Sequence, residues 1–592
     1  MVRSAAWTAG VAAVGSSGLA CRPGWGPPPG RPDGTTLASA VLRPDGPGYV
    51  RLVEGPGWPT LRRDDLIPAA AGVGRGRPPG TSSGGRPEVR ALASVVHLTD
   101  IHVIDAQSTG RVEFADPLGS FFAGAFRPQE TLTAQVATSM VRRVNSLRRG
   151  PITGRRFDCA VSTGDNIDNQ QRNELDWFLR VLDGGWLRPD SGDVGRYEGV
   201  QDAVVVDDRH WHPEPGITDR YKRDFGFPSH PGLLEAAIRP LRSPGLRTPW
   251  YSTYGNHDGL LQGTVPQAAA FDAILAGDRK IVGSGEFGDF TLLAWLLADP
   301  QRVLDELTAG NLPYRTVTPD ARRCPVAPRA WVEAHLASPA LPGPVGHGYT
   351  PDHLEAPALY YDFRIAPGVR GISLDTGGYN SGSIGEGQLR WLEGRLAAAS
   401  SRWFDAAGHE VRTSNDDELV IVFSHFGPSD MDSPMVDPAH PDERRVLGPE
   451  VVDTLLRYPN VVAWVNGHSH RNKVRPVPDP SGRGGGFWDV NTASHVDHPQ
   501  HARIVELVDN LDGTLSIFCT MIDHVAPARV DPAARDPLAL ASISRELAAN
   551  DPQTNLAGHL GTPLDLNVEL RIAAPFAPSA VGVDGRAPAT TG

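Results

Sequence analysis

Five short segments of the chain each place side chains that can bind a metal directly after a run of apolar residues. In chain order these side chains are Asp100, His102, Asp165, Asn256, His257, Asp258, His425, His468 and His470. Carboxylate, imidazole and amide groups without a thiolate suit ions such as Mn, Fe, Zn or Co. Their number is too large for one tetrahedral ion and fits two. The pattern therefore predicts a centre of two divalent or trivalent metal ions, whose identity the sequence leaves open.

The apolar runs before these side chains are typical of buried strands, because they are short and rich in β-branched residues. They read ALASVVHL, FDCAVST, TPWYST, ELVIVF and VVAWVN. Side chains two positions apart share one face of a strand, so Asp100 and His102 can converge on one ion. Loops at the carboxyl ends of strands form the ligand crevice of doubly wound α/β proteins. We therefore expect an α/β fold with the site at the strand ends.

Taken together and in this order, the motifs resemble the calcineurin-like metallophosphoesterase superfamily. The set reads Asp100-x-His102, Gly164-Asp165, Gly255-Asn256-His257-Asp258, His425 and Gly467-His468-x-His470. The first and third motifs are similar to those of bacterial class III cyclic-nucleotide phosphodiesterases. The resemblance implies an α/β (α+β) fold, a four-layer αββα sandwich of two mixed sheets flanked by helices. It also implies hydrolysis of a small-molecule phosphate ester.

The resemblance further implies a role for each of these residues. One ion would be held by Asp100, His102, Asp165 and His470, and the other by Asp165, Asn256, His425 and His468. Asp165 would bridge the two ions, and a bridging hydroxide would attack phosphorus. His257 would stabilise the phosphoryl oxygens or protonate the leaving group, and Asp258 would orient His257. Asp168 is expected just outside the metal ligands.

The spacing of the motifs predicts one catalytic domain with long insertions. The intervals from Asp165 to Asn256 and from Asn256 to His425 far exceed the roughly 30 residues of a βαβ unit. This spacing is similar to that of an exported bacterial subgroup with long inserts between its motifs. We predict a catalytic domain over 91–530 with insertions near 185–245 and 260–355. An N-terminal extension and Pro/Gly-rich linker would cover 31–90, and a C-terminal extension with a disordered tail 531–592.

Four further histidines of the chain could contact the substrate or a metal ion. His347 lies in the second predicted insertion, where it could line the pocket and contact substrate. His495, His498 and His501 are three residues apart and could suggest a further metal site, but we interpret them as surface histidines of a loop beside a strand.

Composition and net charge limit the classes of partner and the cellular locations that we expect for this protein. The formal net charge is −13 and no basic stripe is present, which argues against duplex nucleic acid as a partner. No apolar run is long enough for a transmembrane helix. Residues 1–30 read as a short export signal and linker, so we expect a secreted or cell-envelope protein, or a cytoplasmic one if that segment is no signal.

Two alternatives to a phosphomonoesterase stay open at this point. The same motifs occur in cyclic-nucleotide and other phosphodiesterases, and the insertions would decide between the two substrate classes. A metal-binding scaffold without turnover is the alternative from outside the enzymes, although loss of turnover normally removes ligands and none is missing here. The oligomeric state is not encoded in these patterns.

Overall fold

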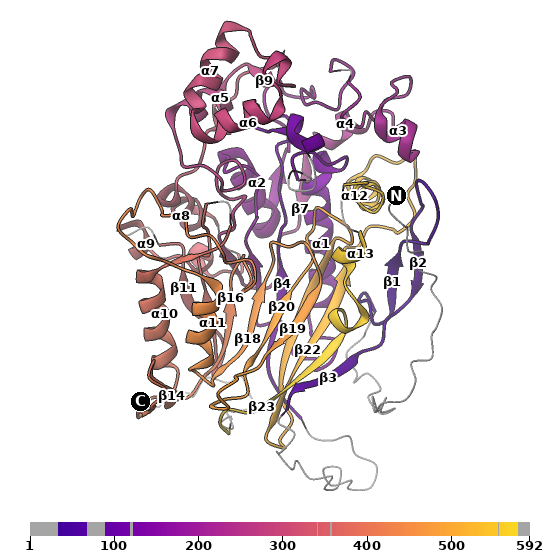
Figure 1. The fold of residues 1–592 in the computed structure, drawn as a ribbon. Helices are drawn as coiled ribbons and strands as arrows, with labels where there is room; N and C mark the ends of the chain where they lie inside the picture. The colour runs from indigo at the N-terminus through magenta and orange to yellow at the C-terminus, as the bar shows by residue number, and fades with distance from the viewer. Residues whose placement is uncertain are drawn as a thin grey trace, which may run out of the picture.

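The computed structural model describes residues 33–67, 89–118, 122, 124–205, 207–339, 341–355, 358–379, 381–553 and 556–577 (Figure 1). The expected export signal, most of the linker before residue 89 and most of the C-terminal tail lie outside these ranges and stay predictions. Within them, no helix combines the length and the apolar character needed to cross a membrane.

A seven-stranded mixed sheet carries the first three motifs. Its order is β3 (Leu61–Leu66), β23 (Val568–Ala573), β22 (Thr514–Asp523), β21 (His501–Asp509), β4 (Arg90–Leu98), β5 (Cys159–Thr163) and β8 (Trp250–Thr253). β4, β5 and β8 are parallel neighbours, and β21 joins β4 in antiparallel pairing. β3 and β23 pair at one edge, although both lie outside the predicted domain of 91–530.

A six-stranded mixed sheet carries the last two motifs. Its order is β11 (Tyr361–Ala366), β12 (Val369–Ser373), β16 (Leu419–Phe423), β18 (Val461–Asn466), β20 (Phe487–Asn491) and β19 (Lys473–Val477). β12, β16, β18 and β20 run parallel, and the two edge strands are antiparallel to their neighbours. The prediction of an α/β protein with mixed central sheets is confirmed.

The alternation of side chains along β16 shows how the two sheets are packed. Leu419, Ile421 and Phe423 belong to the large core cluster that also contains residues of β4, β5 and β21, so they face the seven-stranded sheet. Val420 and Val422 belong to a second cluster on the opposite face. Because successive side chains of a strand point to opposite faces, β16 is buried on both sides.

Helices cover the outer face of the six-stranded sheet. α10 (Glu386–Ala398) and α11 (Gly448–Leu456) pack there through residues of the second cluster, among them Leu389, Leu392 and Leu396 of α10. These three leucines recur at intervals of three and four residues, the spacing of one helix face. α10 therefore buries one apolar face against this sheet.

The seven-stranded sheet is packed against α1 (Thr133–Leu147) and α2 (Arg172–Asp183). In α2 the buried residues Leu175, Phe178, Leu179 and Leu182 form one apolar face. Gly184 ends the helix with φ +92°, a conformation that a glycine adopts without strain. α12 (Pro537–Ala548) packs on α1, with Asp536 capping its first turn.

Further helices and two-stranded sheets lie in the segments outside the two central sheets. The helices are α3 (Arg220–Phe225), α4 (Leu233–Ala237), α5 (Ala269–Ala276), α6 (Asp289–Ala298), α7 (Pro300–Ala309), α8 (Pro328–Ala337), α9 (Asp352–Glu355) and α13 (Leu556–Leu560). Two-stranded sheets pair β1 (Ser39–Leu42) with β2 (Val53–Pro56), β6 (Gly185–Leu187) with β7 (Leu241–Ser243), β9 (Arg279–Ile281) with β10 (Tyr314–Thr316), β13 (Ile384–Gly385) with β17 (Arg445–Val446), and β14 (Arg402–Phe404) with β15 (Glu410–Arg412). Figure 1 shows α5, α6 and α7 together at one end of the molecule.

Candidate metal centre

The loops that follow five parallel strands carry the predicted ligands. Those after β4, β5 and β8 of the seven-stranded sheet hold Asp100, His102, Asp165 and Asn256, and those after β16 and β18 of the six-stranded sheet hold His425, His468 and His470. All seven come from the carboxyl ends of parallel strands. Both sheets therefore contribute to one site.

The backbone at these positions is strained. Asp100, His102, Asp165, His468 and His470 all have φ between +45° and +68°, the left-handed region that side chains rarely adopt. Such strain persists only where the surrounding structure enforces it, and it concentrates at functional sites.

Close approach of the loops also requires glycine beside the ligands. A Cβ atom on Gly255 would lie 2.2 Å from the backbone nitrogen of Asp165 and 2.3 Å from its Oδ1. A Cβ atom on Gly467 would lie 2.4 Å from Asp100 Oδ2. The glycines of the motifs thus allow neighbouring loops to touch.

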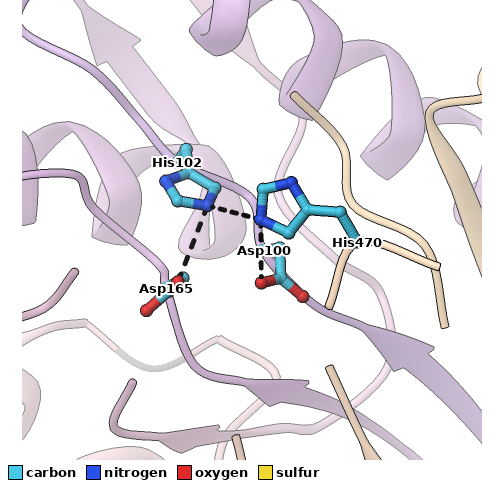
Figure 2. A group of neighbouring side chains, drawn as sticks. All are labelled: Asp100, His102, Asp165 and His470. Atoms are coloured by element: carbon cyan, nitrogen blue, oxygen red, sulfur yellow. Dashed lines mark hydrogen bonds and ion pairs between the residues drawn. The ribbon is translucent and has the colours of Figure 1, made fainter. Parts of the chain in front are cut away.

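The first group of ligands consists of Asp100, His102, Asp165 and His470, whose ligand atoms lie within 4.8 Å of one another (Figure 2). His102 Nε2 is 3.3 Å from His470 Nε2 and 3.7 Å from Asp165 Oδ2. His470 Nε2 is 3.3 Å from Asp100 Oδ1. All four side chains are buried or nearly so, and they point toward one another.

The second group consists of Asp165, His425 and His468, with Asn256 between them. His425 Nε2 is 3.1 Å from Asp165 Oδ2 and 2.9 Å from Asn256 Oδ1. His468 Nδ1 is 3.2 Å from the same amide oxygen. Asp165 therefore belongs to both groups, and it is the residue for which the family resemblance implied a bridging role.

The hydrogen bonds around the two groups show which atoms point inward. His102 Nδ1 bonds to a carboxylate oxygen of Asp168 and His425 Nδ1 to the carbonyl oxygen of Thr163, so each Nδ1 carries the proton and each Nε2 presents a lone pair. Asn256 donates through its Nδ2 to the carbonyl of Gln262, which turns Oδ1 into the site.

Acceptor atoms thus face other acceptor atoms at hydrogen-bonding distance, an arrangement that is stable only with positive charge between them. Without metal, protons supply that charge. Against the effect of burial, the carboxylate of Asp165 raises the pKa of His425 to about 9, and that of Asp100 raises the pKa of His470 to about 9. The donor set of nitrogen and oxygen atoms fits Mn, Fe, Zn or Co ions in place of these protons.

The pKa values of the two carboxyl groups shift in the opposite direction and are lowered. Burial alone would raise the pKa of Asp165, but His425 and His257 outweigh it and hold that pKa below its usual range. His470 does the same for Asp100. His102 differs, because burial and the nearby His257 lower its pKa to about 4. A neutral His102 beside ionised carboxylates is the protonation state of a metal ligand.

His257 lies next to both groups without joining either pair of facing acceptors. Its Nδ1 is 3.1 Å from Asp168 Oδ1, and its backbone N–H donates to Asp165 Oδ1 at 2.7 Å. Its ring meets that of His102 edge-on at 4.5 Å between centroids. About a tenth of its side chain is exposed, so the ring reaches solvent from the rim of the site.

The carboxylate that orients His257 is Asp168, which corrects the role predicted for Asp258. Asp258 accepts hydrogen bonds from the backbone nitrogens of Asn166, Ile167 and Gly255 and from the amide of Asn166. Burial and the nearby Asp165 carboxylate raise the pKa of Asp258 to about 8. Asp258 therefore ties the loop after β8 to the loop after β5. Asp168 lies where it was expected, beside the ligands.

His347 is placed away from the centre, against the prediction that it contacts substrate. Its ring stacks on Trp250 at 3.5 Å between centroids, and its Nε2 is 3.3 Å from Asp183 Oδ2. Trp250 is the first residue of β8, whereas Asn256 follows the other end of that strand. His347 therefore packs in the protein core.

His495, His498 and His501 are buried, so their interpretation as surface histidines is wrong. The backbone nitrogen of His495 donates to the carbonyl oxygen of Asp100, and His501 begins β21. The loop between β20 and β21 thus lies under the metal centre.

Asp497, which the sequence analysis missed, is the residue of this loop whose side chain contacts a candidate ligand. Its Oδ2 lies 2.6 Å from His470 Nδ1, and its carboxylate is bound in turn by Arg127. The only sign of Asp497 in the sequence is its position between His495 and His498, and the spacing of these histidines alone does not indicate that the aspartate contacts the site.

Comparison with known proteins adds a structural likeness. No family model and no curated protein matches the chain. The structure is similar to a dimetal phosphatase from Danio rerio, at 12% identity, 73% coverage of this chain, 99% of that chain and a TM-score of 0.29. It is also similar to purple acid phosphatase PPD1 from seeds of yellow lupin (Lupinus luteus), at 10% identity, 73% and 51% coverage and a TM-score of 0.28. These low identities and TM-scores do not indicate the chemistry of the site, which depends on its side chains.

Proposed function

We propose that this chain is a metal-dependent phosphoesterase with a dinuclear centre, built on the four-layer αββα form of the metallophosphoesterase fold. The observation that carries the proposal is the convergence of facing acceptor atoms from seven side chains in two groups that share Asp165. This arrangement supports two neighbouring metal ions in place of the protons that balance the charge of the metal-free site.

Within this proposal each group holds one ion. Asp100, His102, Asp165 and His470 bind the first, and Asp165, Asn256, His425 and His468 bind the second. When bound, two metal ions would lower the pKa of a water that serves as the nucleophile and would offer positive charge to the oxygens of a phosphoryl group.

The side chains outside the ligands perform the remaining steps. The Nδ1–H of His257 donates a hydrogen bond to the Asp168 carboxylate. In its doubly protonated form the ring so held presents an N–H at Nε2, which donates to a phosphoryl oxygen or passes its proton to the leaving group and is left neutral. The backbone bond from His257 to Asp165 fixes the distance of this ring from the centre. Asp258 and the glycines of the motifs keep the loops in register, so little reorganisation is needed when substrate binds.

The deciding experiment measures turnover and metal content on the same protein. The chain is stripped with a chelator, reloaded with Mn²⁺ and assayed on a panel of phosphomonoesters, cyclic nucleotides and phosphodiesters. We expect phosphate ester hydrolysis that disappears with the metal and returns with it. Turnover of the cyclic nucleotides or diesters alone would assign a phosphodiesterase. Two bound ions without turnover of any ester would make the chain a metal-binding scaffold.

A further inference from the structure

Two buried carboxylates bond to the Nδ1 atoms of three histidines at the metal centre. Asp168 Oδ1 lies 3.0 Å from His102 Nδ1 and 3.1 Å from His257 Nδ1. Asp497 Oδ2 lies 2.6 Å from His470 Nδ1. Such bonds fix the tautomer and the rotation of a ligand histidine.

Each of these carboxylates is bound on its far side by a buried arginine. Arg111 donates through Nη1 to Asp168 Oδ2, the oxygen that the histidines leave free. Arg127 binds Asp497 with two donors, Nε at 2.8 Å from Oδ1 and Nη2 at 3.2 Å from Oδ2. A guanidinium group holds a carboxylate in a fixed plane, which an ammonium group cannot do.

The two arginines are joined through a third buried carboxylate. Glu130 Oε2 accepts from Arg111 Nη2 at 2.9 Å and from the backbone nitrogen of Arg127 at 3.1 Å. Further bonds from Arg111 to the carbonyl of Ala125 and from Arg127 to that of Gly124 tie both guanidinium groups to the same loop. Arg111, Arg127 and Glu130 are each at most 5% exposed, so all of these charges are paired inside the protein.

We propose that Arg111 and Arg127 are positioning residues that fix His102 and His470 through Asp168 and Asp497, and thereby set the affinity of one of the two metal ions. The inference rests on the proposed function, because it uses the division of the ligands between two ions. Neither arginine is part of a motif, and both lie in the stretch between the first and the second motif.

Among the residues that the structure describes, no carboxylate held by an arginine bonds to the ligands that belong to the other ion alone, Asn256, His425 and His468. His425 Nδ1 is held by the backbone carbonyl of Thr163, and Asn256 by the carbonyl of Gln262. The arginines therefore act on one ion alone. Arg111 has an additional effect, because Asp168 also holds His257, which the proposed function assigns to the phosphoryl group rather than to a metal.

The test is a calorimetric titration of the metal-free protein with Mn²⁺, which resolves the two binding steps. In Arg127→Lys and Arg111→Lys we expect the affinity of one step to fall by about 10–100-fold, the range for partners of ligand histidines. The affinity of the other step stays at the wild-type value. Lysine keeps the buried charge, so these variants are expected to fold, and Arg127→Met should show the larger loss.

Turnover at saturating Mn²⁺ separates the two arginines. Arg127→Lys should regain the wild-type kcat once the weakened ion is bound, whereas Arg111→Lys should stay below it because its His257 is also misplaced. The matched control is Arg315→Lys. Arg315 is equally buried and pairs with Asp202 at 2.6 Å, a carboxylate that bonds to no ligand histidine in the described part of the chain, so its replacement should leave both Mn²⁺ steps unchanged.

The outcomes distinguish this proposal from the proposed function. Wild-type protein that binds no Mn²⁺ overturns the proposed function. Wild-type protein with two Mn²⁺ steps, combined with Arg127→Lys and Arg111→Lys that match it in both, overturns the positioning role alone. An equal loss of affinity in Arg315→Lys would also overturn it, because the effect would then belong to any buried arginine.

Discussion

At the scale of single residues, the orientation of lone pairs carries the functional argument. Carboxylate and imidazole groups are common in cores when each acceptor meets a donor. Here the Nε2 atoms of His102 and His425 face other acceptors, because their Nδ1 protons are already used elsewhere. Cations are the partners that satisfy all of these atoms at once.

In the proposed centre, Asp165 is the residue on which both ions would depend. Replacement by asparagine keeps its size and removes the charge that faces His425 and His102. We expect Asp165→Asn to lose both ions and to lower turnover by more than about a hundredfold, since even the partners of ligands are worth 10–100-fold. Metal analysis and rates measured on the same preparation check this. Wild-type activity in Asp165→Asn would exclude the bridging role.

His257 should affect chemistry without affecting metal. We expect His257→Asn to retain both ions and to lower kcat by about 10²–10⁴-fold, the usual contribution of a positioned acid or base. His347→Asn serves as control, because His347 is a buried histidine away from the centre and its loss should leave kcat unchanged. A missing ion in His257→Asn would instead make His257 a ligand.

At the scale of elements, the site depends on how closely the loops at the strand ends approach one another. Apolar strands that end in polar residues, three of them after a glycine, are visible in the sequence, so the five loops could be predicted, and the family resemblance implied which of their side chains bind metal. The pairing of His257 with Asp168 rather than with Asp258 could not, because it depends on how the loops after β5 and β8 pack.

The contacts of residues that lie outside the motifs could not be predicted from the sequence either. Arg111 and Arg127 reach the centre from a stretch without a recurring pattern, and Asp497 lies in a series of regularly spaced histidines that gives no sign of its own contact with His470. Their role arises from tertiary packing alone. His347 shows the opposite case. Its position in an insertion suggested that it lines the substrate pocket, but in the structure its ring packs on Trp250.

Gly255 and Gly394 offer a direct test of loop approach. A methyl group on Gly255 would meet the backbone and side chain of Asp165, so we expect Gly255→Ala to destabilise the protein by about 1–3 kcal/mol and to weaken metal binding. Gly394 is exposed on α10 with open space around it, and Gly394→Ala should stabilise by about 0.5–1 kcal/mol without changing metal content. Denaturant unfolding and metal analysis measure both. Equal changes of unfolding free energy and of metal content in the two variants would contradict the role of Gly255 in the close approach of the loops.

At the scale of the whole molecule, the centre joins the two sheets. Asp100, His102, Asp165 and Asn256 extend from the seven-stranded sheet, whereas His425, His468 and His470 extend from the six-stranded one. The order of the motifs predicted that these segments meet. It did not show that β3 and β23, from outside the predicted domain, complete one sheet, because strand pairing between distant segments leaves no local signal.

Because ligands of each ion come from both sheets, metal should stabilise the fold as a whole. Each ion present at a hundred times its Kd adds about 2.7 kcal/mol to the free energy of unfolding, provided that it binds only the folded chain. We therefore expect a chelator to lower Tm by several degrees and added Mn²⁺ to restore it, as followed by differential scanning calorimetry. In Asp165→Asn, which lacks the carboxylate shared by both groups, neither treatment should move Tm. A metal-dependent Tm that persists in that variant would place the stabilising ions elsewhere in the molecule.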